Sequence, residues 1–269
     1  MFFSIVSFIL LNSALAHYFY KVKKNKTLKN PILLKLSMFT GSLLSLWATT
    51  SLFIPSISIL NNVVVIMVGL YVLSTSATFT FFLVTKNTPI GDIKVSVGDQ
   101  ILPFKTENFN SKSLIGKRTL LKFYRGSWCP YCSSELVMFE ELKVKLAEYN
   151  VQIVGISNDS TEQQAAHLVR DNISHTLVSD PNLNIIRQYG VEHHKAIGAT
   201  AEDTINLFGI HMPSPWKMRY KPMSIPTSIL INESGEVVWI DQSDDYRLRA
   251  SEEAVMSAVN NNFDNKILN

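Results

Sequence analysis

Cysteine is almost absent from this chain, since its 269 residues include only Cys129 and Cys132. Two cysteines three positions apart exclude a disulfide framework, which spreads many cysteines along a chain, and they fall short of a closed zinc site. They lie in the run Trp128-Cys129-Pro130-Tyr131-Cys132, after an apolar strand-like stretch at 119–124 and before a long helical pattern. A lone Cys-x-x-Cys at such a junction is typical of a redox-active dithiol. Inert core thiols and a metal site completed by distant histidines are the alternatives.

Charged side chains are missing from three long apolar stretches, residues 1–20, 36–54 and 57–84. Since roughly 20 apolar residues cross the hydrocarbon core of a bilayer, we predict transmembrane helices at 1–20, 33–54 and 60–84. The chain then divides into a transmembrane segment at 1–85 and a second domain at 86–269. A signal peptide cleaved near Ala14-Leu15-Ala16 is the alternative for the first stretch. Against it, no Lys or Arg precedes the apolar run, and further apolar stretches follow.

Five lysines follow the first apolar stretch, at Lys21, Lys23, Lys24, Lys26 and Lys29. Because short cytoplasmic loops are rich in Lys and Arg, this loop is predicted to face the cytoplasm. After three spans the second domain emerges on the same side, so we expect a multi-pass integral membrane protein, held in the lipid bilayer, with a cytoplasmic redox domain. The formal net charge of +3 comes mostly from this loop and gives no reason to expect a nucleic-acid partner.

Strand-like and helical patterns alternate through residues 86–269. Strands are expected at 119–124, 151–157, 176–179, 227–231 and 236–240, and helices from Pro130, from Ser160, from Asp180 to Gly190 and at 251–259. This order predicts an α/β domain with a mixed central sheet and helices on both faces.

Two segments of this domain have no clear periodicity. Residues 198–221 are expected to form a long irregular insertion, which either covers the active site or rests on the membrane through Trp216, Lys217, Arg219 and Tyr220. The charged segment 241–249 is expected on the surface, without a catalytic role.

The position of Pro130 gives the physical argument for chemistry at the dithiol. Proline suits the first position of a helix, which places Cys129 at the N-cap, facing unpaired backbone N–H groups and the positive end of the helix dipole. Both stabilise a thiolate, so the pKa of Cys129 is expected below the usual value of about 8.5. Cys132, one turn further on, is placed to attack a mixed disulfide on Cys129.

Residues 123–132 (FYRGSWCPYC) resemble the active-site stretch of the redoxin branch of the thioredoxin superfamily. The resemblance is greatest to peroxiredoxin-like proteins of the alkyl hydroperoxide reductase / thiol-specific antioxidant class. Ser179-Asp180-Pro181, Tyr189-Gly190-Val191 and Ile225-Pro226-Thr227 match further pieces in the same order. The resemblance covers about residues 97–262 and implies a thioredoxin-like fold. It also implies thiol chemistry that uses no bound cofactor or metal but needs a thioredoxin- or glutathione-like electron donor.

Two alignments to that superfamily assign the cysteines differently. On the peroxiredoxin pattern Pro-x-x-x-Thr-x-x-Cys, Cys132 attacks peroxide, while Arg125 and Cys129 replace the proline and the threonine. On the thioredoxin or glutaredoxin pattern, Cys129 attacks and Cys132 resolves, and Pro226 matches the cis-proline beside the dithiol. Peroxiredoxins hold the peroxide with an arginine near that second segment, which residues 225–227 do not supply.

The sequence therefore predicts a membrane-anchored oxidoreductase that uses Cys129 and Cys132 for thiol–disulfide exchange with protein disulfides. Reduction of hydroperoxides is the first alternative, with Thr227 and Arg125 as donors around the O–O bond. In either case Trp128 packs over the dithiol and shields it. A copper-binding module without turnover, completed by His193-His194, is the second alternative.

Overall fold

The computed structural model describes residues 1–53, 58–90, 92–207 and 209–263. The chain forms two compact units. The first contains Met1–Val22 and Thr27–Lys86, and the second contains Lys23–Lys26 and Asn87–Asn269.

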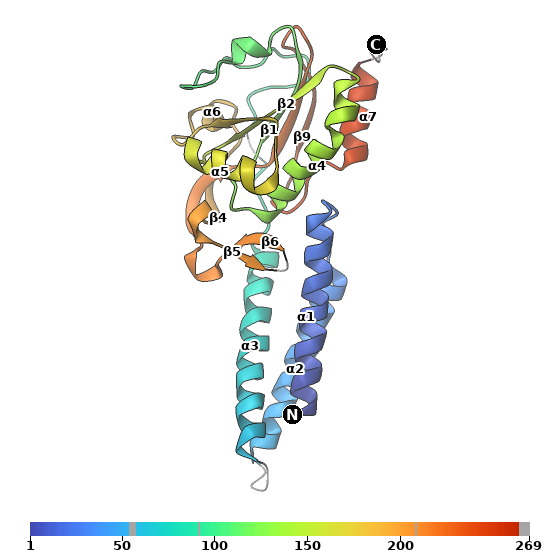
Figure 1. The fold of residues 1–269 in the computed structure, drawn as a ribbon, viewed down its shortest axis with the longest axis vertical. Helices are drawn as coiled ribbons and strands as arrows, with labels where there is room; N and C mark the ends of the chain where they lie inside the picture. Colours follow the sequence, from blue (N-terminus) through green and yellow to red (C-terminus); the bar gives the residue numbers. More distant parts are fainter. Residues whose placement is uncertain (54–57, 91, 208, 264–269) are drawn as a thin grey trace. The chain divides into compact units, whose positions relative to one another are not determined.

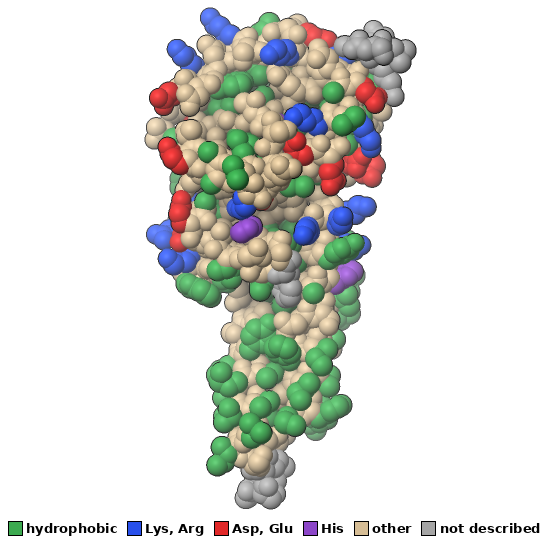
Figure 2. Space-filling view, in the orientation of Figure 1, with side chains coloured by type: hydrophobic (Ala, Val, Ile, Leu, Met, Phe, Trp, Pro, Cys, Tyr) green, Lys and Arg blue, Asp and Glu red, His purple; other side chains and the backbone are tan. Residues whose placement is uncertain are grey.

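The first unit consists of long helices whose residues are mostly apolar. They are α1 (Phe2–Lys23), α2 (Ile32–Thr49), continued by the 3-10 helix η1 (Thr50–Phe53), and α3 (Ile59–Val84). All three are long and apolar enough to cross a membrane. Apolar side chains cover the face of these helices seen in Figure 2. The three predicted helices are confirmed, apart from the end of the second at residue 54, which lies outside the described residues.

The second unit is built on a mixed five-stranded sheet in the order β3-β2-β1-β8-β9 (Figure 1). Its strands are β1 (Arg118–Phe123), β2 (Val151–Ser157), β3 (Thr176–Ser179), β8 (Thr227–Ile231) and β9 (Val237–Gln242). The first three run parallel to one another, whereas β8 is antiparallel to both β1 and β9. The helices are α4 (Pro130–Ala147), α5 (Thr161–Asp171), α6 (Asn184–Gln188) and α7 (Glu252–Asn262), with a 3-10 helix η2 (Ser111–Leu114) before β1. The predicted mixed sheet and thioredoxin-like fold are confirmed.

Alternation along β1 assigns its side chains to the two faces of the sheet. Leu120 and Tyr124 pack in one buried cluster with α4 and α7, while Leu121 and Phe123 pack in a second cluster with α6. Lys122 has the same parity as Leu120 and Tyr124, so it points toward α4. This strand therefore carries a charged residue into the core beneath the cysteine helix.

Helix α4 begins as the sequence predicts, with Cys129 at the N-cap and Pro130 at the first helical position. The stripe Leu136, Phe139, Leu142 and Leu146 is buried against the sheet, at most 1 % exposed. Burying such side chains stabilises the fold by about 1.5–3 kcal/mol each. The buried stripe fixes the rotation of α4 and hence the direction in which its first turn presents the cysteines.

Helix α6 starts later than predicted. Pro181 and Asn182 form a turn, and the Asp180 carboxylate accepts hydrogen bonds from the backbone N–H groups of Asn184 (2.8 Å) and Ile186 (2.9 Å). Asp180 thus satisfies the unpaired donors of the helix from four residues away instead of as its N-cap. The chain leaves α6 through Gly190 at φ +67°, where a Cβ would lie 1.9 Å from the backbone oxygen of Asp92, so only glycine fits.

The insertion at 198–221 is not irregular, and that expectation was wrong for its described residues. Strands β4 (Glu192–Gly198) and β7 (Arg219–Ser224) form one antiparallel pair, and β5 (Thr204–Leu207) and β6 (Ile210–Pro213) form another. Short 3-10 helices η3 (Ala201–Asp203) and η4 (Pro215–Lys217) connect them. Lysines, prolines and a bulge in the β4–β7 pair break the alternation that would have indicated these strands.

Candidate active site

The two cysteines occupy the first turn of α4 and are both free thiols. Cys129 is 1 % exposed and Cys132 is 0 % exposed, and both belong to the buried cluster that also contains Trp128. The predicted pairing of the thiols at a strand-to-helix junction is present. Both residues are, however, covered by the protein, so even a small molecule reaches the sulfur atoms only through a local opening.

The Cys132 sulfur accepts hydrogen bonds from one positively charged side chain and one backbone N–H group. The Arg249 side chain donates through Nη2 to the Cys132 Sγ at 3.1 Å, and the backbone N–H of Arg125 donates to the same sulfur at 3.4 Å. Arg249 follows β9 in the chain and lies 117 positions after Cys132. Hydrogen bonds from a charged donor to sulfur favour its anionic form.

The pKa values of the two thiols therefore move in opposite directions, and the expectation of a thiolate on Cys129 is not met. Burial raises the pKa of Cys129, and its hydrogen bond to Cys132 raises it further. Burial also disfavours a charge on Cys132. Even so, the hydrogen bond from Cys129 and the charge of Arg249 bring the pKa of Cys132 well below its usual value. The donors aimed at Cys132 therefore favour a negative charge on that sulfur over one on Cys129.

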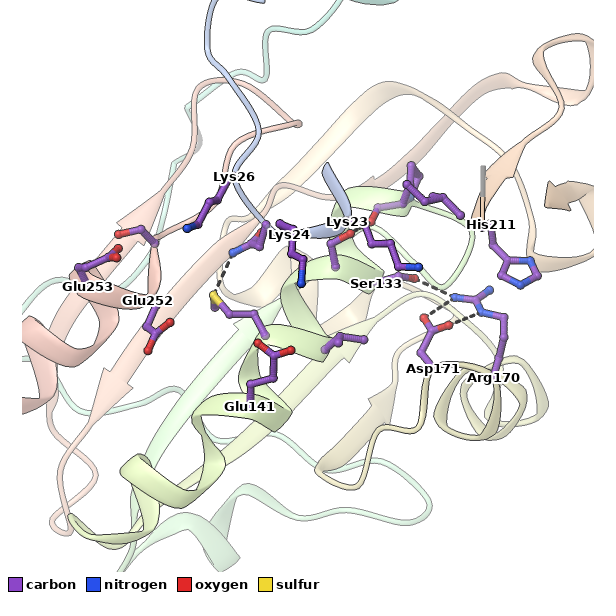
Figure 3. Close-up of a pocket in the computed structure, with 18 residues that line it drawn as sticks. Lys23, Lys24, Lys26, Ser133, Glu141, Arg170, Asp171, His211, Glu252 and Glu253 are labelled. Carbon is purple, nitrogen blue, oxygen red and sulfur yellow. Dashed lines mark hydrogen bonds and ion pairs between the residues drawn. The ribbon is translucent and has the colours of Figure 1, made fainter. Parts of the chain in front are cut away.

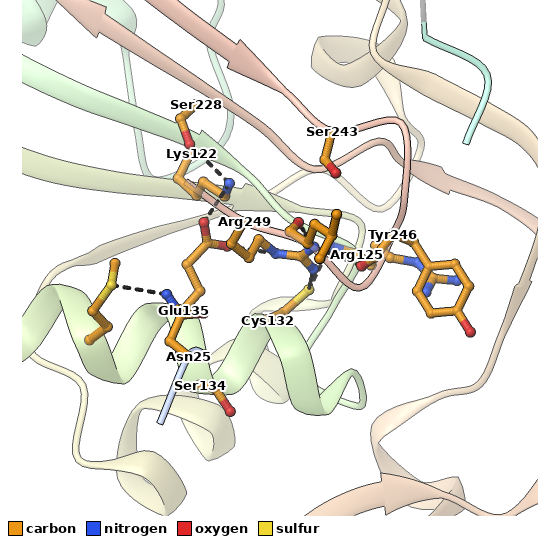
Figure 4. Close-up of polar contacts among 12 residues, drawn as sticks. Asn25, Lys122, Arg125, Cys132, Ser134, Glu135, Ser228, Ser243, Tyr246 and Arg249 are labelled. Atoms are coloured by element: carbon orange, nitrogen blue, oxygen red, sulfur yellow. Dashed lines mark hydrogen bonds and ion pairs between the residues drawn. The ribbon is translucent and has the colours of Figure 1, made fainter. Parts of the chain in front are cut away.

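Arg249 is itself held by a buried group of charges (Figure 4). Its Nε lies 2.9 Å from Glu135 Oε2, and the other carboxylate oxygen of Glu135 lies 2.8 Å from Lys122 Nζ. Lys122 also donates to the Ser228 hydroxyl at 3.0 Å. The side chains of Lys122, Glu135 and Arg249 are at most 2 % exposed. Burial raises the pKa of Glu135, while the two neighbouring cations oppose that rise.

Arg125 contacts the Cys132 sulfur through its backbone N–H group, whereas its side chain contacts other residues. Its guanidinium donates to Met223 Sδ at 3.2 Å and to the backbone oxygen of Ile197, and it stacks over the Tyr246 ring with 4.2 Å to the centroid. These contacts hold its positive charge near both thiols, where it opposes the effect of burial on their pKa values. Arg125 thus acts on the thiols through its charge, and its role as a donor to peroxide stays a prediction.

Trp128 packs against β4 and β7, the two strands at the ends of the insertion. A Cβ placed on Gly198 of β4 would lie 3.0 Å from the Trp128 ring, and the Arg125 and Lys221 cations lie 5.0 and 5.8 Å from its centroid. Strands β4 and β7 therefore cover the tryptophan beside the dithiol. Trp216 and Tyr220, which the sequence places on the membrane as an alternative, are 77 % and 65 % exposed.

The segment 225–227 is buried beside the site, but its groups are already engaged. The peptide bond before Pro226 is trans, so the match to a cis-proline does not extend to its geometry. The Thr227 hydroxyl donates to the backbone oxygen of Ile225 at 3.0 Å and accepts from Gln242 Nε2 at 3.1 Å. Thr227 consequently has no hydroxyl proton left for an O–O bond.

His193 and His194, which were expected to complete a copper site, both lie on β4. The side chain of His194 is 80 % exposed and lies 3.1 Å from Glu192, whereas His193 is half-buried, and burial lowers its pKa to about 4. Among the described residues, no group of three His, Cys, Asp or Glu side chains is placed to hold a metal ion. The geometry therefore gives the copper alternative no ligand set.

A pocket of about 430 Å³ is lined by residues of the first turns of α4 but by neither cysteine (Figure 3). Ser133 lies there, accepting from Arg170 Nη2 at 2.8 Å, and Arg170 pairs with Asp171 at 2.7 Å. Lysines and carboxylates, among them Lys24 and Glu141, line it together and offset one another. The pocket is therefore not an evident anion site, and the charged partners of sulfur lie on the other face of the helix.

Sequence reasoning missed Arg249, Glu135 and Lys122. The segment 241–249 was expected on the surface, but Arg247 is 1 % exposed and the Arg249 side chain is 2 % exposed, so that expectation was wrong for both. The one usable signal was Lys122, a lysine inside an apolar strand, because a buried cation requires a partner.

Comparison with known proteins identifies the family of this chain. The AhpC/TSA family profile matches residues 92–240, which is more than half of the chain. A putative peroxiredoxin bcp of Haemophilus influenzae is 27 % identical over 151 residues, covering 54 % of this chain and 85 % of the relative. The thiol-disulfide oxidoreductase ResA of Halalkalibacterium halodurans is 28 % identical over 147 residues, covering 52 % and 65 %. The crystal structure of peroxidoxin BcpB from Mycobacterium tuberculosis superposes with a TM-score of 0.45 at 21 % identity, covering 62 % and 95 %. This chain belongs to the AhpC/TSA family and is a thiol-based oxidoreductase.

Proposed function

We propose that the protein reduces hydroperoxides, with Cys132 as the attacking thiolate and Cys129 as the resolving thiol. The observation that carries this proposal is the contact between Arg249 Nη2 and the Cys132 sulfur, at 3.1 Å. A guanidinium beside the attacking sulfur stabilises the thiolate. It can also donate to the peroxide oxygen on which negative charge develops as the O–O bond breaks.

The covered position of the sulfurs favours a small oxidant over a protein disulfide. With exposures of 1 % and 0 %, neither sulfur can be reached in line by a disulfide on another protein without prior opening of the site. A hydroperoxide needs far less space. Thiol–disulfide exchange remains the second candidate, because the Cys-x-x-Cys spacing suits it and one relative is named as a thiol-disulfide oxidoreductase.

The proposed cycle balances without a cofactor. The Cys132 thiolate attacks the terminal oxygen of ROOH, giving a sulfenic acid on Cys132 and RO⁻, which takes a proton from water. Cys129 then attacks the sulfenic sulfur, and the disulfide forms with release of water. Two electrons from a thioredoxin- or glutathione-like dithiol or thiol pair restore both thiols.

Peroxide and disulfide substrates can be compared directly on the reduced full-length protein in detergent or nanodiscs. We expect oxidation by hydrogen peroxide to be faster than that of free cysteine by more than about 30-fold at pH 7. Ionisation alone accounts for that factor, because a thiol with a pKa near 8.5 is only about 3 % thiolate. Slow reaction with peroxide together with fast oxidation by glutathione disulfide would favour the second candidate.

We also propose that the domain containing the dithiol faces the cytoplasm. The lysine-rich loop after α1 supports this, since three spans put that loop and the redox domain on one side of a membrane. Protease added to intact cells should leave the domain uncut and should digest it only after permeabilisation. Digestion in intact cells would place it on the outside.

A further inference from the structure

Lys122 is a cation in the centre of the sheet. It is 1 % exposed, and its neighbours on β1 are buried apolar side chains. Across the strand pair it faces Ser228 of β8, its register partner, whose hydroxyl accepts its hydrogen bond. An ion buried in this way destabilises a protein unless it is paired, so Lys122 requires the carboxylate that α4 brings to it.

That carboxylate, Glu135, is shared between two cations. It lies 2.8 Å from Lys122 and 2.9 Å from Arg249, while Arg249 also reaches the Cys132 sulfur at 3.1 Å. With Lys122 present, the group of two cations and one carboxylate has one positive charge left for the sulfur. Without Lys122, Glu135 and Arg249 form a neutral pair, and a thiolate becomes an additional negative charge in the core.

We propose that Lys122 is a positioning residue for the redox chemistry, because by neutralising Glu135 it leaves the charge of Arg249 to Cys132 and favours the reduced dithiol over the disulfide. The proposal deepens the proposed function and rests on Cys132 being the anionic sulfur. It assigns a role to a residue that touches neither the substrate nor the thiols.

The redox consequence follows from the charges. Oxidation of Cys129–SH and Cys132–S⁻ to the disulfide releases one proton and two electrons, which the peroxide accepts. It also removes the negative charge beside Arg249, so that two buried cations, Lys122 and Arg249, are left with one carboxylate, that of Glu135. Since charge interactions are strong in a poorly solvated interior, the disulfide is the less stable state and is easily reduced by a thiol donor.

Opposite shifts in two variants test this charge assignment on the reduced full-length protein, without peroxide. In Lys122→Met, we expect the thiolate, followed by its ultraviolet absorbance, to form at higher pH. The equilibrium in glutathione buffers should move at least tenfold toward the disulfide. In Glu135→Gln, no carboxylate offsets the two cations. The thiolate should then form at lower pH, and the equilibrium should move toward the dithiol. The double variant should lie near the wild type.

Lys117→Met is the matched control, because it removes an exposed lysine just before the same strand and should change neither quantity. The other ionisable groups that influence Cys132 are Cys129, Arg125, Tyr124 and Asp159, and all four are unchanged in these variants.

Shifts of both single variants in the same direction, or no shift in Lys122→Met, would overturn the proposal. If Lys122→Met does not fold, the sign of the Glu135→Gln shift still decides. Failure of the peroxidase function is separate, since the wild type would then be inert toward peroxide while the opposite shifts persist.

Discussion

Replacing Cys132 by serine is expected to lower peroxide reduction at least about 1,000-fold, because it removes the only thiolate that the site stabilises. Cys129→Ser should behave differently. Its Cys132 sulfur keeps the contacts with Arg249 and with the Arg125 backbone, so it should still react once with peroxide. The product then stalls as a sulfenic acid, since no neighbouring thiol condenses with it.

The asymmetry can be measured by combining stopped-flow oxidation with mass spectrometry of the product. Cys129→Ser should consume one equivalent of peroxide and gain one oxygen atom on Cys132, whereas Cys132→Ser should gain none at the same rate. The wild type should lose two hydrogen atoms instead, as the disulfide forms. Activity that survives in Cys132→Ser and disappears in Cys129→Ser would show that Cys129 attacks, as in the thioredoxin pattern.

Arg249→Met should produce the second large effect, a loss of about 100- to 1,000-fold in the rate with peroxide at neutral pH, as for removal of one donor to a developing anion. Arg249 donates to the Cys132 sulfur at 3.1 Å, and its charge helps to lower the pKa of that thiol. Without it, the Cys132 pKa rises. The wild-type rate should be independent of pH across the neutral range because the thiolate is already formed, whereas the variant rate should increase with pH.

Arg247→Met separates this effect from general disruption. Arg247 is also buried, but its guanidinium pairs with Asp245 at 2.7 Å. Its loss should lower stability while leaving the pH profile of the peroxide reaction unchanged. Arg249→Lys retains the charge and should recover part of the rate. A flat pH profile in Arg249→Met would mean that another group ionises the thiol.

The fold was largely predictable because its signals are local. Each signal depends on a few neighbouring residues. Examples are the apolar stripe from Leu136 to Leu146, the proline after Cys129 and the alternating apolar runs. The active-site charges were not predictable in the same way. Arg249 meets Cys132 only because the hairpin of β8 and β9 brings the chain back to the level of the C-terminal end of β1. The sequence around Arg249 is also polar enough to be taken for surface.

The assignment of the thiolate failed for a related reason. A helix N-cap stabilises an anion when nothing stronger competes, and from sequence Cys129 occupied that position. In the folded chain, a guanidinium and a backbone N–H both donate to the Cys132 sulfur, while burial raises the pKa of Cys129 despite the helix terminus and the nearby arginine charges. A contact made across 117 positions therefore outweighs the local one.

The placement of both cysteines in a single helical turn has a consequence for survival under oxidative stress. A sulfenic acid is lost to irreversible sulfinic and sulfonic acids when a second peroxide reaches it before a thiol does. In the proposed cycle the resolving thiol, Cys129, is hydrogen-bonded to Cys132 from the start, so closure should require no unwinding of α4 and no second subunit. A second peroxide would have to reach Cys132 before Cys129 attacks it to trap the intermediate. The enzyme should accordingly keep working at peroxide concentrations that permanently inactivate thiol enzymes with a distant resolving cysteine.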